Sequence, residues 1–541
     1  VGAAKVAPDE DTEALLKAPS PPFGETPDTE DGVCDSCKRR CRACCGPCCL
    51  CSTLNCFVLL VVILVVYVVF RVTGTITVYG TTFTQANYWD QSGAYLRAGT
   101  RDNSSLIAFY NDMPNADTGV ASGPGPNTVS FFTWEGTAQQ LASWGDRIKS
   151  GTFKRYNELG VTIMNDLVWP ETGTIALGYS NRDHGFVRPF IAEALDNARK
   201  PRDHCDGSAC WNMRWLREVF EDRFASMEVV SSTDLRWLVT VVLHKVLLDI
   251  DLSDAEAKEF ATWMLAFILP QPFPPSWAYS RLFAFVLNTP GTLETKARYM
   301  DRFKAAVQAK WPDRPWSSEP RDLVLLASAM IDAAALAGGL SVPTVLDYMI
   351  ALLFMKESPA HPTTLEHMRG GGATVHNFMF ETMRRFAAVA GVPNWSTDDD
   401  GETWHHQIPN LQMAMMDPEV FPDPLAFLPG RPGLRDGNMS RSIGWADMAT
   451  VDGDIANPDS HSCPGKELSV QLTSACIQEL ARAGPWELVE DDVSTTMYST
   501  SGWSLRKVGS DGTPSEHLEP DMWLCRHARW LCDLLDRDNF L

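Results

Sequence analysis

Residues 460–465 read Ser-His-Ser-Cys-Pro-Gly, and an amphipathic stretch follows from Val470 to Ala483. Apolar residues recur there with helical spacing, so we expect a helix that begins soon after the cysteine. The field at a helix N-terminus favours a thiolate, and Gly465 allows the backbone to approach the sulfur closely. A buried structural cysteine is the alternative when Cys463 is considered alone. The arrangement favours a thiolate ligand held on a rigid loop.

Two further motifs precede this cysteine. The stretch HNFMFETMRRFAAV (376–389) has a helical pattern and places Glu381 and Arg384 three residues apart, where they can form an ion pair. The stretch DPEVFPDPLAFLPGRPG (417–433) then places Arg431 on a loop rich in proline and glycine. An isolated E-x-x-R pair is common and usually weak. The order of the three motifs is much more specific than any one of them.

This order resembles the C-terminal half of the cytochrome P-450 superfamily. That family has an E-x-x-R helix, a D-P-E-x-F-P-D-P segment, a P-x-R loop and a C-x-G before its last long helix. The resemblance implies that residues 74–541 form a mainly α domain of cytochrome P-450-like fold with a small β subdomain. It implies haem b (iron protoporphyrin IX) as cofactor, with Cys463 as the ligand of the haem iron. It also implies that Glu381, Arg384 and Arg431 form a triad that braces the cysteine loop.

The resemblance assigns further residues to cofactor binding. His461 falls where the family usually has an Arg facing a haem propionate, and Gly465 is the glycine of the C-x-G motif. His184 and Arg188 are four residues apart at the start of a helical stretch. They are similar to the family's helix that reaches the haem propionates, although a surface pair explains the same spacing.

The stretch IDAAALAGGLSVPTVLDYM (331–349) is the candidate for the long helix across the haem face. By resemblance, four of its residues are expected to line the distal pocket where the substrate reacts: Ala335, Gly338, Gly339 and Ser341. Leu340 stands at the family's acid position and cannot relay a proton, and Pro343 is expected to disturb the helix. Both departures argue against ordinary dioxygen activation.

The cysteine loop also departs from the usual family pattern. It lacks the usual Phe and Gly, and GWADMATVDGDIANPDSHSC (444–463) looks lengthened. The lengthened loop with its Asn-Pro is similar to the allene oxide synthase and hydroperoxide lyase branch, as is the glycine pair. This likeness implies an enzyme that rearranges or cleaves fatty-acid (lipid) hydroperoxides without an external reductase. That branch has an Asn where this chain has Ala335, so a reductase-dependent monooxygenase and a non-catalytic subunit of a membrane complex remain as alternatives.

The first 73 residues divide into three parts. Residues 1–33 are rich in Pro, Asp and Glu, which is typical of a disordered acidic tail, and residues 34–53 are basic and rich in Cys. The apolar residues 54–73 predict one transmembrane helix. Basic residues precede that helix, so the positive-inside rule places the N-terminus in the cytosol and the haem domain on the lumenal or external side. Three N-x-S sequons fit that side, at Asn103, Asn394 and Asn438.

The cysteines fall into separate groups. Of the 15 cysteines, nine lie between Cys34 and Cys56, where S-acylation beside a membrane is the simplest explanation and a metal site or inert thiols are the alternatives. Cys205 and Cys210 are close enough in sequence for a loop disulfide, with a metal site as the weaker alternative.

The formal net charge of −22 argues against nucleic acid as a partner, and it makes the chain a poor match for an acidic reductase. The expected partners are a lipid hydroperoxide, a membrane, and further proteins of a membrane complex. Helical periodicity is also clear at 235–248, 258–269, 293–310 and 323–340, and residues 74–79 resemble a strand.

Overall fold

The computed structural model describes residues 75–78, 81–84, 120–122, 128–155, 179–199, 211–268, 292–359, 363–389, 391–392, 394–397, 404–435, 441–493, 495, 500 and 502–510. The chain divides into two units, Val1–Arg71 and Val72–Leu541, and every described residue belongs to the second. Several predicted features lie outside the described residues: the acidic tail, the Cys-rich segment, the membrane helix at 54–73, Cys205 and Cys210, and the sequons at Asn103 and Asn438.

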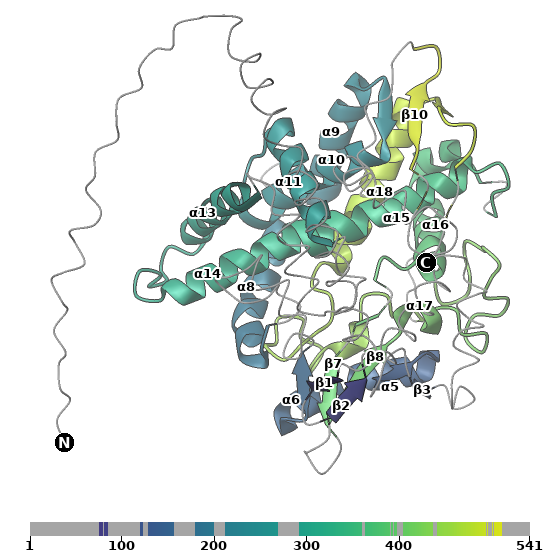
Figure 1. Ribbon diagram of the computed structural model, residues 1–541. Helices are drawn as coiled ribbons and strands as arrows, with labels where there is room; N and C mark the ends of the chain where they lie inside the picture. The colour runs from purple at the N-terminus through teal and green to yellow at the C-terminus, as the bar shows by residue number, and fades with distance from the viewer. Residues whose placement is uncertain are drawn as a thin grey trace, which may run out of the picture. The chain divides into compact units, whose positions relative to one another are not determined.

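Helices make up most of the described chain, as predicted (Figure 1). Their bounds are α5 Trp134–Ala142, α6 Trp144–Ser150, α8 Asn181–Arg199, α9 Trp211–Ser226, α10 Ser232–Leu248, α11 Asp254–Ile268, α13 Thr292–Lys310, α14 Pro320–Ile331, η5 Asp332–Ala337, α15 Gly338–Phe354, η6 Leu365–Gly370, α16 Ala373–Arg385, α17 Leu411–Ala414, η7 Asp447–Ala449 and α18 Lys466–Ala483. The helices predicted from periodicity are all present with ends shifted by a few residues, except that the one predicted at 323–340 continues to Phe354.

The longest helical element joins α14, the π-helical turn η5 and α15 into one span from Pro320 to Phe354 (Figure 1). The expectation that Pro343 would disturb this helix is wrong, because α15 continues through it. A proline removes only one helical hydrogen bond, and a π-helical turn relaxes the backbone nearby. Packing of α15 against α10 and α18 supplies the remaining constraint.

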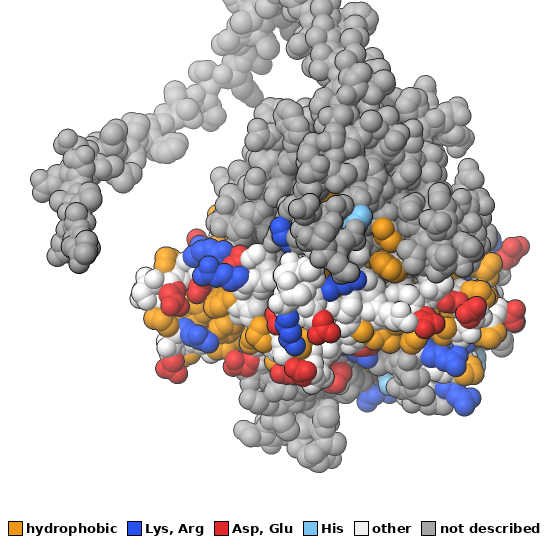
Figure 2. Space-filling view, turned by 90° about the horizontal axis from the view of Figure 1, so that it is seen from below, with side chains coloured by type: hydrophobic (Ala, Val, Ile, Leu, Met, Phe, Trp, Pro, Cys, Tyr) orange, Lys and Arg blue, Asp and Glu red, His pale blue; other side chains and the backbone are white. Residues whose placement is uncertain are grey.

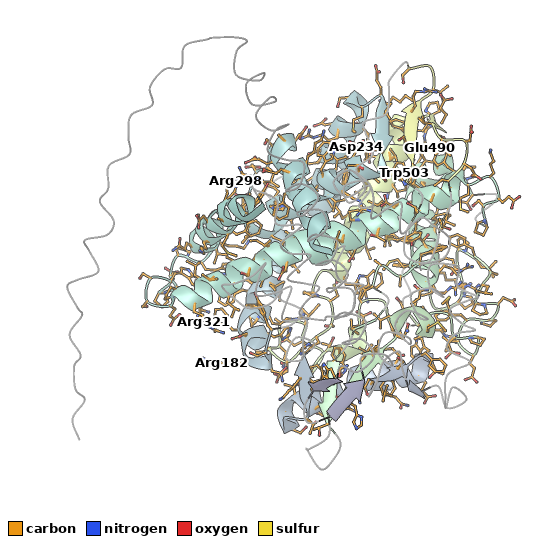
Figure 3. All side chains as sticks on the ribbon, viewed as in Figure 1. Arg182, Asp234, Arg298, Arg321, Glu490 and Trp503 are labelled. Atoms are coloured by element: carbon orange, nitrogen blue, oxygen red, sulfur yellow. The ribbon has the colours of Figure 1, made fainter. Side chains whose placement is uncertain are left out.

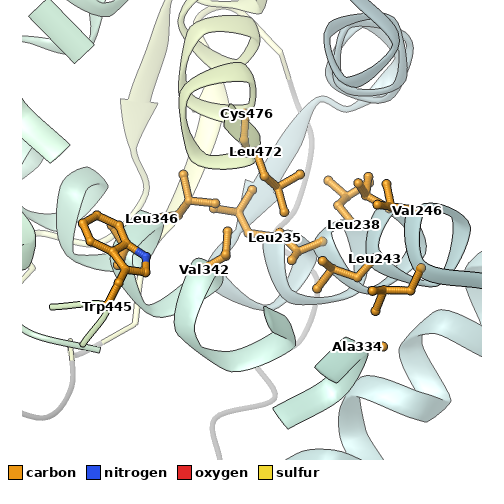
Figure 4. Packing of buried hydrophobic residues seen from close by; sticks show 14 of the residues in the cluster. Leu235, Leu238, Leu243, Val246, Ala334, Val342, Leu346, Trp445, Leu472 and Cys476 are labelled. Carbon is orange, nitrogen blue, oxygen red and sulfur yellow. The ribbon is translucent and has the colours of Figure 1, made fainter. Parts of the chain in front are cut away.

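The core lies where α10, α15 and α18 meet. Leu235 of α10, Leu346 of α15 and Leu472 of α18 are all fully buried, and Figure 4 shows them converging with Val342. Each such side chain contributes about 1.5–3 kcal/mol through removal of apolar surface from water. This packing fixes α18, and therefore the loop that leads into it, against the long helix.

The sheets are small, as predicted. Their strands are β1 Thr75–Val78, β2 Thr81–Thr84, β3 Val120–Ser122, β4 Thr128–Phe131, β5 Phe153–Arg155, β6 Val229–Ser231, β7 Asn394–Thr397, β8 Trp404–Pro409, β9 Trp486–Leu488 and β10 Ser504–Lys507. The five-stranded sheet has the order β3-β4-β8-β7-β5, the three-stranded sheet β6-β10-β9, and β1 pairs with β2. The strands β7 and β8 form a hairpin after the E-x-x-R helix, with Trp395 opposite His406.

Asn394 corrects one sequence expectation. It lies in β7 opposite Gln407, and only 1% of it is exposed. A buried strand residue cannot carry a bulky hydrophilic oligosaccharide in the folded protein. The sequon at Asn394 is therefore not a glycosylation site of the folded chain.

Among the described residues, one helical span is long and apolar enough to cross a membrane, namely Pro320–Phe354. It is the long core helix, and 73% of its most apolar window is buried within the fold. Its hydrophobic character is therefore explained by packing.

The described surface carries both signs of charge. On the face in Figure 2, blue basic and red acidic side chains are interspersed along the band of described residues.

Candidate functional site

Cys463 lies three residues before α18, and its backbone N–H donates to the Trp445 carbonyl at 2.8 Å. Burial raises the pKa of its thiol, against the opposing effects of the Gly465 N–H and of the Arg188 charge. The Gly465 N–H and the Arg188 charge both act in the predicted direction, since each favours the thiolate. Cys463 as a residue is half-buried.

Gly465 has a different role from the expected one. Its backbone is in an ordinary region with φ −90°, and a Cβ added there would lie 3.9 Å from the Cys463 Sγ. That separation is a normal van der Waals contact, so close approach does not require glycine. What Gly465 supplies is a backbone N–H directed at the sulfur.

The lengthened loop before the cysteine, residues 446–462, folds back on itself. Val451 and Asp454 form a bridge, the Ser460 Oγ accepts from the Val451 N–H at 2.8 Å, and the same hydroxyl donates to the Asp454 carbonyl at 2.6 Å. The His461 N–H donates to the Ala449 carbonyl at 2.8 Å. These bonds satisfy the backbone of an irregular segment and give the loop a defined shape.

Helix α8 carries His184 and Arg188 to this loop. Arg188 donates from Nε to the Ile455 carbonyl at 2.7 Å and from Nη2 to the Ser462 carbonyl at 2.6 Å. The His184 ring stacks on the His461 ring with centroids 4.2 Å apart, and its Nδ1 lies 3.1 Å from the Pro458 carbonyl. The structure therefore brings these three predicted residues together at the cysteine loop, where the Arg188 guanidinium binds two backbone carbonyls, and their contact with haem propionates stays a prediction.

The predicted contacts among Glu381, Arg384 and Arg431 are confirmed. Arg384 binds Glu381 through two nitrogens, at 2.9 Å and 2.8 Å, and the Arg431 Nε donates to the same carboxylate at 2.9 Å. All three side chains are buried, with exposures of 1%, 0% and 6%. The remaining donors of the two arginines reach backbone carbonyls between residues 415 and 426: those of Met415, Pro422, Asp423, Pro424 and Ala426.

The triad therefore braces the segment 415–426. The sequence had led us to expect that it would brace the cysteine loop itself. The connection to the loop runs through Phe380, the neighbour of Glu381, whose ring meets the Trp445 ring edge-on at 6.0 Å. The Trp445 carbonyl in turn accepts the Cys463 N–H.

Gly338 and Gly339 pack against α10. A Cβ on Gly338 would lie 2.6 Å from the Leu243 Cδ1, and one on Gly339 would lie 2.8 Å from the Ala334 carbonyl oxygen. A side chain on Gly338 would require Leu243 to move, whereas one on Gly339 would meet the backbone of the π-helical turn. Ser341 is half-buried on α15, and Ala335 lies within η5 with its side chain outside the described part. Their role in a distal pocket stays a prediction.

The sequence did not single out Trp445 or Ser460. Trp445 accepts the cysteine N–H, and its indole Nε1–H donates to the Ser469 Oγ at 3.1 Å. Ser460 is fully buried and joins the two ends of the loop's turn. Both residues form hydrogen bonds with or through backbone groups of distant residues, and such bonds leave no spacing pattern in the sequence. The Asn457-Pro458 turn was the one available signal that the loop is structured.

A haem-thiolate group requires a sulfur donor, and Cys463 can supply one. Its sulfur receives the Gly465 N–H and lies near the Arg188 and Lys466 charges that favour a thiolate. Among the described residues, no group of three or more metal-binding side chains occurs. The donor chemistry fits a haem-thiolate group better than a metal held by several side chains.

The comparisons with known proteins identify the fold. No protein-family model and no curated protein sequence matches this chain. It is similar in structure to P450BioI in complex with hexadec-9Z-enoic acid ligated acyl carrier protein, at 17% identity and TM-score 0.52, over 77% of this chain and 100% of that one.

Two further structures agree. Ligand-free CYP164A2 of Mycobacterium smegmatis is 15% identical, with TM-score 0.50 over 77% of this chain and 100% of that one. CalO2 is 15% identical, with TM-score 0.50 over 72% of this chain and 93% of that one. Together with the E-x-x-R triad and the cysteine before α18, these similarities show that the chain has the cytochrome P450 fold.

Proposed function

We propose that this protein binds haem b through the Cys463 thiolate. The observation that carries the proposal is the position of Cys463 on the loop directly before α18 in a cytochrome P450 fold, where its sulfur receives the Gly465 N–H. When bound, haem with a thiolate ligand supplies an electron-rich iron centre suited to cleaving O–O bonds. The chain's own contribution is to hold the sulfur through the Trp445 carbonyl and the Gly465 N–H.

We further propose that the substrate already contains the O–O bond, as in a lipid hydroperoxide. Delivery of protons to dioxygen needs an acid close to the distal alcohol, and Leu340 precedes Ser341. The acids of the long helix lie elsewhere: Asp347 pairs with Arg236 of α10 at 3.0 Å, and Asp332 lies in the π-helical turn. A hydroperoxide needs no such relay for dioxygen and no reductase.

A long acyl chain is the favoured substrate class. P450BioI, which shares this fold, holds an acyl carrier protein ligated with hexadec-9Z-enoic acid. We also propose that residues 54–73 and the Cys34–Cys56 cluster anchor the protein in a membrane, where lipid hydroperoxides arise. The anchor would place the domain next to its substrate.

The first test is the absorbance spectrum of the full chain, reduced and exposed to carbon monoxide. We expect a strongly red-shifted Soret band that is lost in Cys463→Ala and kept in Cys476→Ala. Cys476 is the matched control because it lies fully buried in α18, away from the loop. A folded protein without a haem band would contradict the proposal and favour the non-catalytic alternative.

The second test separates the two kinds of enzyme. A fatty-acid hydroperoxide is added without reductase or NADPH, and the loss of the hydroperoxide is followed with the parent fatty acid as control. Consumption that disappears in Cys463→Ala supports the proposal. Turnover that requires a reductase and NADPH would favour the monooxygenase.

A further inference from the structure

The first turns of α8 contact the second half of the cysteine loop at three backbone carbonyls. Arg188 donates to the carbonyls of Ile455 and Ser462, and His184 Nδ1 lies 3.1 Å from that of Pro458. Gly185 lies against the same proline, since a Cβ added there would be 3.3 Å from the Pro458 Cβ. The helix therefore contacts the segment 455–462 at both of its ends and in its middle.

Arg188 dominates this contact. It is only 4% exposed, so its charge has left water and its hydrogen bonds act with little screening. Its two contacts lie at the two ends of the segment 455–462, and Ser462 is the residue directly before Cys463. Fixing the Ser462 carbonyl fixes the peptide plane from which the cysteine projects.

We infer that Arg188 is the positioning residue for the iron-ligating cysteine, acting through the Ser462 and Ile455 carbonyls. The inference rests on the proposed haem-thiolate function. Arg188 does not touch the reacting atoms. It sets where the sulfur lies by restraining the loop that precedes it.

The planar guanidinium explains why arginine occupies this position. Two of its nitrogens point in fixed directions and reach two carbonyls at once, whereas a lysine ammonium is a single point charge on a flexible stem. Arg188→Lys should therefore retain one of the two hydrogen bonds to the loop. Arg188→Gln should lose the charge and most of the restraint on the loop. The two variants form a graded series.

Arg182 provides a matched control. It lies on α8 less than two turns before Arg188, is exposed to solvent, and appears near the end of that helix in Figure 3. Replacing Arg182 by Gln removes the same charge from the same helix without touching the loop. Any effect of overall charge on the protein is therefore shared by Arg182→Gln and Arg188→Gln.

The decisive measurement is hydrogen–deuterium exchange of backbone amides in the full chain, which does not require bound haem. We expect Arg188→Gln to speed exchange of the loop amides of Val451, His461 and Cys463 by about tenfold or more, since two charge-assisted hydrogen bonds are lost. Arg188→Lys should lie between wild type and Arg188→Gln, and Arg182→Gln should match the wild type. Exchange in the buried centre of α18 should be unchanged in every variant.

Two exchange results would overturn the inference. Loop exchange at the wild-type rate in Arg188→Gln would show that the loop is held without this residue. A uniform rise across α18 and the loop, in Arg188→Gln and Arg188→Lys alike, would show that Arg188 supports the whole fold and not the cysteine.

A spectroscopic measurement then connects the loop to the ligand. In the reduced, carbon monoxide-treated protein, Arg188→Gln should shift part of the Soret absorption away from the red-shifted thiolate form, and Arg188→Lys should restore part of it. A wild-type protein with no haem band contradicts the proposed function, while the exchange data still decide whether Arg188 holds the loop. An unchanged band in Arg188→Gln with a loosened loop would overturn the link to the sulfur.

Discussion

The protein should lose stability when the pH falls from 7 to 5, because His244 stays neutral in the folded chain. Replacing His244 by Leu should make that loss smaller by about 2 kcal/mol. His244 lies on α10 and is 1% exposed, with the rings of Phe260 and Phe303 edge-on to it at 4.5 Å and 5.3 Å. Its Nδ1 lies 2.7 Å from the Thr240 carbonyl, which can only accept, so this nitrogen carries the proton of the neutral ring. The aromatic cage leaves no room for the water that a charged imidazolium needs.

The magnitude follows from the pKa. Burial lowers the pKa of His244 from 6.5 to about 4. Between these values the unfolded chain binds a proton that the folded chain does not, so stability falls as the pH drops below 6.5 and the loss is complete near pH 4. The two pKa values correspond to about 3.4 kcal/mol at the low-pH limit, and to about 2 kcal/mol at pH 5.

The assay is urea unfolding of the full chain at pH 7 and pH 5, followed by tryptophan fluorescence. The quantity compared is the change in unfolding free energy between the two pH values, so a packing defect of His244→Leu common to both cancels. His367→Gln is the control, because His367 is exposed and Gln can keep its contact with Thr364. A pH 5 loss as large in His244→Leu as in the wild type would refute the reasoning.

Three further outcomes are expected. Glu381→Gln leaves two buried guanidinium groups without their carboxylate, so thermal unfolding should show a stability loss of about 3–5 kcal/mol. Glu366→Gln, in an exposed ion pair, should cost under about 1 kcal/mol. Equal stability losses in the two variants would contradict the buried network. Gly338→Ala should cost about 1–3 kcal/mol through contact with Leu243, and Leu243→Ala in the same chain should recover part of it; strictly additive losses in a double-mutant cycle would exclude the contact. Burial raises the pKa of Asp347 from 3.8 to about 7, so between these pH values the folded chain holds a proton that the unfolded chain has released. The free energy of unfolding should therefore fall as the pH rises from 3.8 to 7. Urea titrations of Asp347→Asn should show a weaker pH dependence of this free energy, and an unchanged pH dependence would contradict the raised pKa.

The parts of the fold that follow a repeating pattern could be predicted from the sequence. Helical periodicity located α10, α13 and α18, because burial of one helix face imposes a regular spacing. The Glu381–Arg384 contact was predictable for the same reason, since residues three apart share a face. These features depend on local geometry.

Other features could not be predicted, because their partners are distant or belong to the backbone. The sequence gives no sign that Arg188 binds two loop carbonyls, since any residue could supply them. The glycine pair at 338–339 fits a ligand pocket or a helix contact equally well until α10 is placed. Pro343 is compatible with a helix only once the surrounding packing and the π-helical turn are known.

The contact between Arg188 and Ser462 also has a consequence for the order of assembly. These residues are 274 positions apart in the chain, so the bond forms only after a very long loop has closed. Contacts of such separation slow folding, and a chain emerging from the ribosome completes α8 long before the cysteine has been synthesised. The N-terminal half must therefore wait, partly folded, for the segment that carries the sulfur. Insertion of a cofactor that depends on this cysteine must then follow synthesis of residue 463, and a chain truncated before residue 455 would lack both carbonyls that Arg188 binds.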